Sequence, residues 1–418
     1  MLAIKTSVFS KSIVNQSQKC YTIVVKKKVI LIAVFLIISL LVGVGCTPRL
    51  TTPEGEDYTY YRPKSYTSIE FFGTATYLVL AGNTSDKSVV ERMDATWGKV
   101  KEALRQIDEA INESVNGSDI DRFNNAEAGE RVEVSKYTYD IVSLCKSLNA
   151  TTGGKFDPTT ARLVDLWGFS PRFAGDYEPI EPYDRADYKQ TLPDDIYVQA
   201  FNSLVGVDKV GLLQEEDKYY LVKPTDTVTV EGVEYTVTLS LGGIGKGYAC
   251  DIAYEIVKES GFNFGYVNVG TSSLSLLKST KPVYDDNPLA WRVGVVNPRG
   301  EGNYLSVKAC DQGFSTSGDY ERYYEIDGKR YCHIIADDGY PIDGGIITAS
   351  VVGESSAMCD ALSTAICCMS VNETMDFVNG LDYNAYFVFE QGGKYRVFTN
   401  APDTMTINSG DFVLYEQD

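Results

Sequence analysis

The order of its helical and strand-forming segments limits the folds open to this chain. Apolar residues recur at helical spacing from Val89 to Ile111 and predict a long amphipathic helix over residues 86–113. Further helices are predicted over residues 135–151, 195–204, 246–260, 358–367 and 372–381. The strand-forming stretches between them do not alternate one for one with the helices. This order predicts an α+β protein with mixed or antiparallel sheets.

The predicted strands are short and end at turn residues. Residues 66–82 form either one long strand or a strand pair around Gly73. Residues 320–338 form a hairpin that turns at Asp327–Gly328. The remaining strands are predicted over residues 219–222, 264–269, 291–296, 304–307 and 346–352, with a last hairpin over 384–399. Residues 227–241 are also predicted as strand, with a turn at Glu231–Gly232.

The N-terminal region is typical of an exported protein. Lys26, Lys27 and Lys28 precede an uncharged apolar run that ends in small residues before Cys46. We expect residues 1–45 to be a lipoprotein signal peptide and Cys46 to carry the lipid. An uncleaved membrane anchor is the alternative, because the run is near the length that spans a bilayer.

The predicted lipid attachment at Cys46 also determines the expected domains and location. Residues 46–65 are rich in Thr, Pro, Tyr and acidic residues, which is typical of a tether. Residues 66–418 then form one domain outside the cytoplasm, held at the cell membrane by the lipid on Cys46. Translation is expected to start at Val24 or Val25, because residues 1–25 exceed the usual length before the apolar run.

The charge of the mature chain excludes some partners. Residues 1–45 hold six lysines and no acid, so the rest has 32 basic and 57 acidic side chains, a net charge of −25. Such a surface repels nucleic acid and anionic lipid, and an anionic ligand needs a local cation. The cysteines after Cys46 number seven and lie in apolar contexts, which does not indicate a disulfide framework. A single histidine, His333, excludes a multi-histidine metal site.

Two glycine-rich stretches are candidate ligand loops. "SLGGIGKGYACD", residues 240–251, joins a strand to a helix, and Lys246 adds a positive charge to the helix N-terminus. It matches neither a Walker loop nor a dinucleotide turn, and a purely structural turn is equally favoured. "TTGGKFDPTTARLVDLWGF", residues 151–169, places Asp157 before a proline. Asp157 either caps a helix beginning near Thr159 or contacts a ligand, with Phe156 beneath a flat ring.

"STSGDYERYYEIDGKRYCHIIADDGYP", residues 315–341, gathers polar residues in what we expect to be one hairpin. Thr316, Ser317, Asp319 and His333 fall within it. A Ser-His-Asp hydrolase is one interpretation, although no GxSxG elbow supports it. A lone histidine is more often a hydrogen-bonded structural residue.

"MCDALSTAIC", residues 358–367, carries Asp360 and Thr364 four positions apart, so both project from one helix face. A buried carboxylate needs a partner. The pair offers the hard oxygen ligands that Mg²⁺ prefers. The alternative is a capping aspartate and a threonine bonded back to the helix.

Taken in order with "FFGTATY" and "GSDIDRFN", these motifs resemble the ApbE family of FAD:protein FMN transferases, over roughly residues 68–370. The resemblance implies an α+β fold with a T-fold-like core and an FAD-binding cleft. It implies Mg²⁺-dependent transfer of FMN from FAD to a threonine hydroxyl of an acceptor flavoprotein, with release of AMP. The acceptors belong to membrane or surface electron-transfer systems, and many members are lipoproteins.

The resemblance assigns site residues position by position. Asp360, Thr364 and the backbone carbonyl of Gly243 match the Mg²⁺ ligands. His333 matches a catalytic histidine, which would accept the proton of the acceptor hydroxyl because its ordinary pKa lies near working pH. The positions that match FAD contacts are Phe72, Lys155, Phe156, Asp157, Ser240, Lys246 and Ile335.

Several positions depart from the family pattern. Ser240 stands where the family usually has an aspartate that touches FAD, and Ser114 where some members have a tyrosine that stacks on the flavin. Ala336 replaces an aspartate in a shortened loop, and "GTS" at residues 270–272 replaces "GGD". Two alternatives therefore stay open: a Mg²⁺-dependent FAD pyrophosphatase, and a non-catalytic lipoprotein that binds FAD for electron transfer.

Overall fold

The computed structural model describes residues 60–173, 179, 181–185, 187–281 and 287–416. The predicted signal peptide, Cys46 and most of the predicted tether lie outside these residues. Strand β1 (Arg62–Phe71) begins inside the range expected to be tether, because its first residues pair with the end of β2 (Thr74–Gly82). Of the two predictions for residues 66–82, the strand pair is therefore correct. No helix of the described residues is long and apolar enough to span a bilayer.

A nine-stranded sheet forms the centre of the fold, in the order β1-β2-β8-β9-β12-β15-β16-β17-β19. Its neighbouring strands are antiparallel except β17 and β19, which are parallel. The further strands are β8 (Gly265–Val269), β9 (Ser273–Leu276), β12 (Gln312–Gly318), β15 (Ile346–Gly353), β16 (Asn384–Gln391), β17 (Lys394–Thr399) and β19 (Phe412–Leu414).

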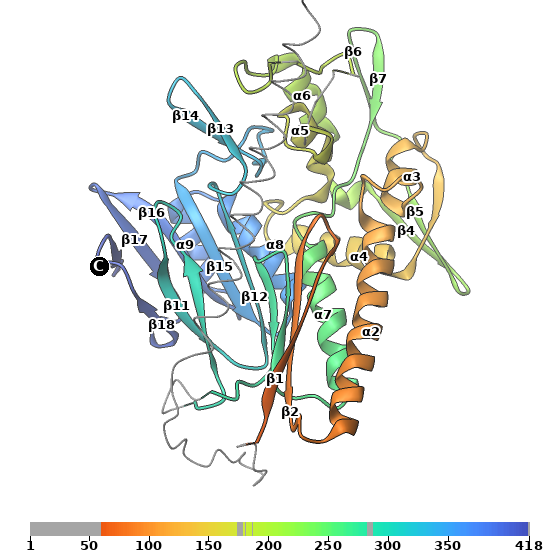
Figure 1. The fold of residues 1–418 in the computed structure, drawn as a ribbon. Helices are drawn as coiled ribbons and strands as arrows, with labels where there is room; N and C mark the ends of the chain where they lie inside the picture. The colour runs from red at the N-terminus through yellow and green to blue at the C-terminus, as the bar shows by residue number, and fades with distance from the viewer. Residues whose placement is uncertain (1–59, 174–178, 180, 186, 282–286, 417–418) are drawn as a thin grey trace, which may run out of the picture. The chain divides into compact units, whose positions relative to one another are not determined.

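The two faces of this sheet are covered differently. Helices α7 (Gly245–Glu259) and α8 (Ser356–Cys367) pack on one face, and α2 (Lys87–Ile111) packs beside α7 (Figure 1). A three-stranded sheet of β10 (Trp291–Val296), β11 (Asn303–Ala309) and β18 (Met405–Ile407) covers the other. Val351 and Val352 of β15 therefore belong to two different apolar cores, and β15 is buried along its whole length.

The smaller elements lie at one end of the helices. Helices α3 (Asp119–Asn125) and α4 (Lys136–Thr151) pack with the sheet β3 (Arg131–Val134), β5 (Lys218–Val222), β4 (Gly211–Glu215). A separate aromatic core includes Trp167, Phe201 and Tyr235. Two helices and two hairpins pack around it: α5 (Ala161–Leu166), α6 (Asp195–Leu204), β6 (Thr227–Val230)–β7 (Val233–Thr236) and β13 (Tyr323–Ile326)–β14 (Lys329–Cys332). Helix α9 (Val371–Asn379) packs against β16.

The α+β prediction is confirmed, and each predicted helix is found to within two residues at its ends. The turn predicted at Glu231–Gly232 is confirmed, because it joins β6 to β7, but the strand expected to continue to residue 241 ends at Thr236. The single hairpin expected over residues 315–341 is wrong: Thr316 and Ser317 lie on β12 of the large sheet, and only the turn at Asp327–Gly328 joins a hairpin. The seven cysteines of the described residues are free thiols, as predicted.

Candidate active site

A cavity of about 540 Å³ lies where the large sheet, its helices and the smaller elements meet. This volume is in the range of small-molecule sites. The tip of the β1–β2 hairpin, the end of α2 and the loop after α4 contribute to its wall, as do the glycine-rich turn before α7, the end of β12 and helix α8. The cavity therefore collects segments that lie far apart in the sequence.

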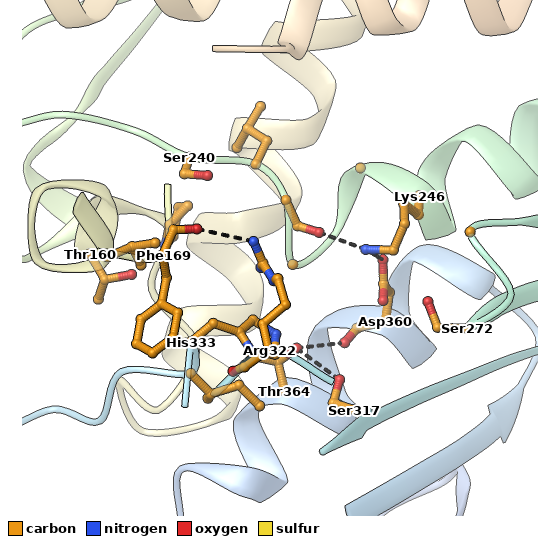
Figure 2. A pocket seen from close by; sticks show the side chains of 18 of the residues that line it. Thr160, Phe169, Ser240, Lys246, Ser272, Ser317, Arg322, His333, Asp360 and Thr364 are labelled. Carbon is orange, nitrogen blue, oxygen red and sulfur yellow. Dashed lines mark hydrogen bonds and ion pairs between the residues drawn. The ribbon is translucent and has the colours of Figure 1, made fainter. Parts of the chain in front are cut away.

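The glycine-rich turn brings a lysine and bare backbone to the wall. Gly242, Gly243 and Lys246 line the cavity. The Lys246 ammonium donates to the Gly242 carbonyl at 2.9 Å and lies 3.9 Å from Oδ2 of Asp360 (Figure 2). The turn thus presents a cation and bare backbone at the N-terminus of α7, which favour an anion, and the cation also faces the Asp360 carboxylate.

Asp360 and Thr364 project from one face of α8 into this cavity, as their spacing predicts. The buried Asp360 carboxylate accepts the Ser315 hydroxyl at 2.9 Å and the Gly247 amide at 3.1 Å. Thr364 Oγ1 donates to the Asp360 carbonyl at 3.2 Å, so the back-bonded alternative is correct for this hydroxyl. Asp360 does not cap α8, because Ser355 holds that position.

Gly243 lies close enough to share a ligand with this pair. A Cβ placed on Gly243 would be 3.7 Å from Thr364 Oγ1. The three positions expected to hold Mg²⁺ therefore meet on one side of the cavity. Their oxygens are a carboxylate, a hydroxyl and a carbonyl, the hard donors that suit Mg²⁺. The described residues contain no group of three His, Cys, Asp or Glu side chains placed to hold a metal ion.

His333 lines the same cavity and has a defined orientation. Its Nδ1 is 3.3 Å from the Arg322 carbonyl. A carbonyl only accepts, so Nδ1 carries the proton and Nε2 keeps a free lone pair. Burial and the nearby Arg322 guanidinium lower the pKa of His333 to about 3. The expectation of an ordinary histidine pKa is therefore wrong for the free protein, in which the ring is neutral.

The Ser-His-Asp interpretation is wrong, because the aspartate is engaged elsewhere. Asp319 accepts two hydrogen bonds from the Arg299 guanidinium, at 2.7 and 2.6 Å. The Nδ1 atom of His333 faces a carbonyl in place of a carboxylate.

The predicted FAD contacts all line the cavity, though several are engaged within the protein. Lys155 Nζ pairs with Asp337 at 2.8 Å and lies 3.5 Å from Glu373. Asp157 accepts the Thr159 amide at 2.8 Å and so caps a short 3-10 helix, as its capping interpretation states, while Phe156 is buried.

The predicted FAD contacts Phe72, Ser240 and Ile335 lie elsewhere in the cavity wall. Phe72 occupies the hairpin tip with a φ of +54°, a conformation that is costly for a non-glycine residue and typical of functional sites. Ser240 lines the cavity with Glu113, and its side chain lowers the pKa of the Glu113 carboxyl against the effect of burial. The carbonyl of Ile335, expected to contact FAD, accepts the Cys368 thiol at 3.6 Å.

Comparison with known proteins decides the family. The sequence model of the ApbE family matches residues 72–387. This chain belongs to the ApbE family.

Relatives and solved structures agree with this assignment. The FAD:protein FMN transferases of Klebsiella pneumoniae and Escherichia coli are 26% and 25% identical, over 73% and 72% of this chain and 80% and 78% of theirs. The flavin transferase ApbE of Vibrio cholerae superposes with a TM-score of 0.64 at 20% identity, over 81% of this chain and 97% of that one. The ApbE protein of Thermotoga maritima gives 0.62 at 26% identity, over 80% and 96%. The likeness confirms the predicted ApbE-like α+β fold.

The departures from the ApbE pattern also have structural counterparts. Ser114 is not part of the cavity wall; its amide donates to Asn112, and the neighbouring Glu113 lines the cavity instead. Burial raises the pKa of Glu113, and the Ser240 side chain opposes that shift. The Ala336 amide donates to the Tyr340 carbonyl at 2.8 Å, which closes the shortened loop.

Arg322, Glu321 and Ser315 line or support the site and were not predicted from the sequence. The Arg322 guanidinium donates to the Phe169 carbonyl at 3.1 Å and lines the cavity (Figure 2). Burial lowers the pKa of Arg322 and raises that of Glu321. All three residues were visible in the "STSGDYERYY" motif. Glu321 and Arg322 lie between β12 and β13, where no periodicity orients them, and Ser315 lies on β12, where the sequence does not indicate its partner.

Proposed function

We propose that this ApbE-family chain is an FAD:protein FMN transferase that modifies a threonine of an acceptor protein. The bond between the threonine oxygen and the FMN phosphorus forms, and the bond from that phosphorus to the AMP phosphate breaks. AMP leaves, and the threonine proton goes to His333. One observation carries the proposal: Asp360, Thr364, Gly243 and Lys246 meet His333 in one cavity.

The charges of the cavity suit a pyrophosphate. Lys246 and Arg322 are cationic side chains in its wall, in a mature chain of net charge −25. The N-terminus of α7 adds amide donors and the positive end of its dipole. Phosphoryl transfer depends mostly on positioning and on neutralising charge, which these groups supply.

A divalent cation completes this charge balance. Asp360, Thr364 and the Gly243 carbonyl are the residues that would hold Mg²⁺. When bound there, Mg²⁺ would supply a Lewis acid for the phosphoryl oxygens. Ser315 and the Gly247 amide hold the Asp360 carboxylate in one orientation for this purpose.

His333 has the protonation state that a general base needs. Its low pKa keeps it neutral at working pH, and the Arg322 carbonyl fixes the proton on Nδ1. The lone pair on Nε2 is then available to accept the threonine proton.

The location is proposed from the N-terminal region. The apolar run before Cys46 favours export and lipid attachment, with the catalytic domain outside the cytoplasm. The acceptors we propose are flavoproteins of membrane or surface electron-transfer systems.

The test is incubation of the purified chain with FAD, MgCl₂ and an acceptor domain that carries a candidate threonine. Mass spectrometry of the acceptor should show covalently added FMN, and the same domain with that threonine changed to valine should stay unmodified. Release of FMN and AMP with an unmodified acceptor would indicate a pyrophosphatase. Intact bound FAD would indicate a carrier.

A further inference from the structure

Helix α7 begins without a side-chain cap of its own. Its N-cap residue is Ile244, which has no side-chain acceptor, and no cap hydrogen bond comes from it. The third amide of the helix, that of Gly247, donates instead to Asp360 Oδ2 of α8 at 3.1 Å. The Asp360 carboxylate thus serves α7 in the way that a capping Ser or Asp normally serves its own helix.

The first turn of α8 is held in return by a carboxylate from α7. Asp251 accepts the Ser356 amide at 2.7 Å, the Ala357 amide at 3.0 Å and the Ser355 hydroxyl at 2.7 Å. The Ser356 and Ala357 amides belong to the first turn of α8 and have no partner inside the helix. Each helix therefore caps the start of the other.

The two caps fix one register between the helices. Asp251 lies four residues after Gly247, whose amide Asp360 accepts. Asp360 lies four residues after Ser356, whose amide Asp251 accepts. On each helix, therefore, the carboxylate lies one turn after the amide that is donated to the other helix. The helices also touch at this point: a Cβ on Gly247 would lie 2.3 Å from the Ser356 carbonyl oxygen. Neither helix can shift along the other without losing a cap.

We propose that Asp251 is a positioning residue for the metal and pyrophosphate site. The inference rests on the proposed function, since the ligands it aligns are those proposed for Mg²⁺. Gly243 lies just before α7, whereas Asp360 and Thr364 lie on α8, so the register of the two helices sets the distance between the ligands. Asp251 is not part of the cavity wall and acts only through this register.

The chain offers a matched control for the loss of such a cap. Asp119 of α3 holds the start of α4 from another helix, accepting the amide of the N-cap residue Ser135 at 2.8 Å and the Thr138 hydroxyl at 2.7 Å, and it also pairs with Arg122 at 2.7 Å. Asp119 is buried and Asp251 is partly buried, and neither lines the cavity. Asp251→Asn and Asp119→Asn should therefore cost similar stability, while only Asp251→Asn should disturb the ligands.

The experiment titrates each purified full-length variant with Mn²⁺ and measures the free ion by electron paramagnetic resonance. Asp251→Asn should weaken Mn²⁺ binding by about 10- to 100-fold, the usual loss when support of metal ligands is removed. Asp119→Asn should bind as the wild type does. Equal binding by wild type and Asp251→Asn overturns the inference.

Two further variants keep the outcomes distinct. If Asp360→Asn, with Asp251 unchanged, binds Mn²⁺ as tightly as the wild type does, the proposed metal site itself is wrong. If Asp251→Asn does not fold, Gly247→Ala tests the same register through the clash with Ser356. Wild-type Mn²⁺ affinity in Gly247→Ala would then refute the positioning role, and weakened affinity would support it.

Discussion

Ser315→Ala removes the hydroxyl that orients the proposed metal ligand. Ser315 lies on β12 and is fully buried. Its hydroxyl donates to Asp360 Oδ1 at 2.9 Å and lies 3.1 Å from the hydroxyl of Ser273. In the variant, Asp360 keeps the Gly247 amide on Oδ2 and loses its donor on Oδ1.

The size of the effect follows from what the carboxylate loses. A hydrogen bond to a charged group contributes about 1.5–3 kcal/mol, and the free energy of unfolding should fall by that order. Loss of such support for a metal ligand typically weakens binding about 10- to 100-fold. At about 1.4 kcal/mol for each factor of ten, the two estimates agree.

The assay measures FMN transfer against MgCl₂ concentration at saturating FAD. Ser315→Ala should need roughly tenfold or more Mg²⁺ for half-maximal rate, with a smaller change in the maximal rate. Ser306→Ala is the control, because Ser306 is a buried serine of β11 that accepts Asn408 at 2.8 Å outside the cavity. A Mg²⁺ dependence in Ser315→Ala equal to that of the wild type would refute the reasoning.

The other proposed residues give direct tests. Asp360→Asn keeps the size of the side chain and removes its charge, so transfer should be lost across a magnesium titration; wild-type activity there contradicts the metal assignment. His333→Ala should bind FAD nearly normally and transfer FMN about 10²–10⁴ times more slowly. Loss of FAD binding, with an unchanged rate at saturating FAD, would make His333 a binding residue. Cys46→Ser should abolish lipidation, and a mature wild-type N-terminus elsewhere, without lipid, would show that the lipoprotein signal peptide interpretation is wrong.

The helices were predictable because their signals are local. Asp86 and Ser135, the residues at which two helices were predicted to begin, are the N-caps of α2 and α4, each accepting an amide two or three residues later. Residues 195–204 were predicted with both ends of α6 correct, and in the structure the side chain of Asp194 caps its N-terminus. Spacing on a single helix also placed Asp360 and Thr364 on one face.

The supporting residues were not predictable, because their partners are distant in the chain. Ser315 and Gly247 hold Asp360 across 45 and 113 residues. No periodicity specifies which carboxylate accepts a given amide from another helix. Arg322 lies in a turn, where alternation does not indicate which side chains are buried. The family resemblance supplied the residues expected to touch substrate, but not the residues that hold them in place.

The lowered pKa of His333 links proton transfer to substrate binding. Two of its causes are the cations Arg322 and Lys246, which also face the site where a pyrophosphate would bind. An anion placed between them offsets their repulsion of a protonated ring, so the pKa of His333 should rise from about 3 toward its ordinary value. In the free protein the His333 ring is protonated only below that low pKa. The fall in kcat/KM that protonation of His333 causes should therefore lie far below pH 6.5. Because His333 is the only histidine of the chain, NMR of histidine-labelled protein reads it without ambiguity. Titration with and without ADP in the absence of metal should show the rise, and an unchanged or lower pKa with ADP bound would refute this coupling.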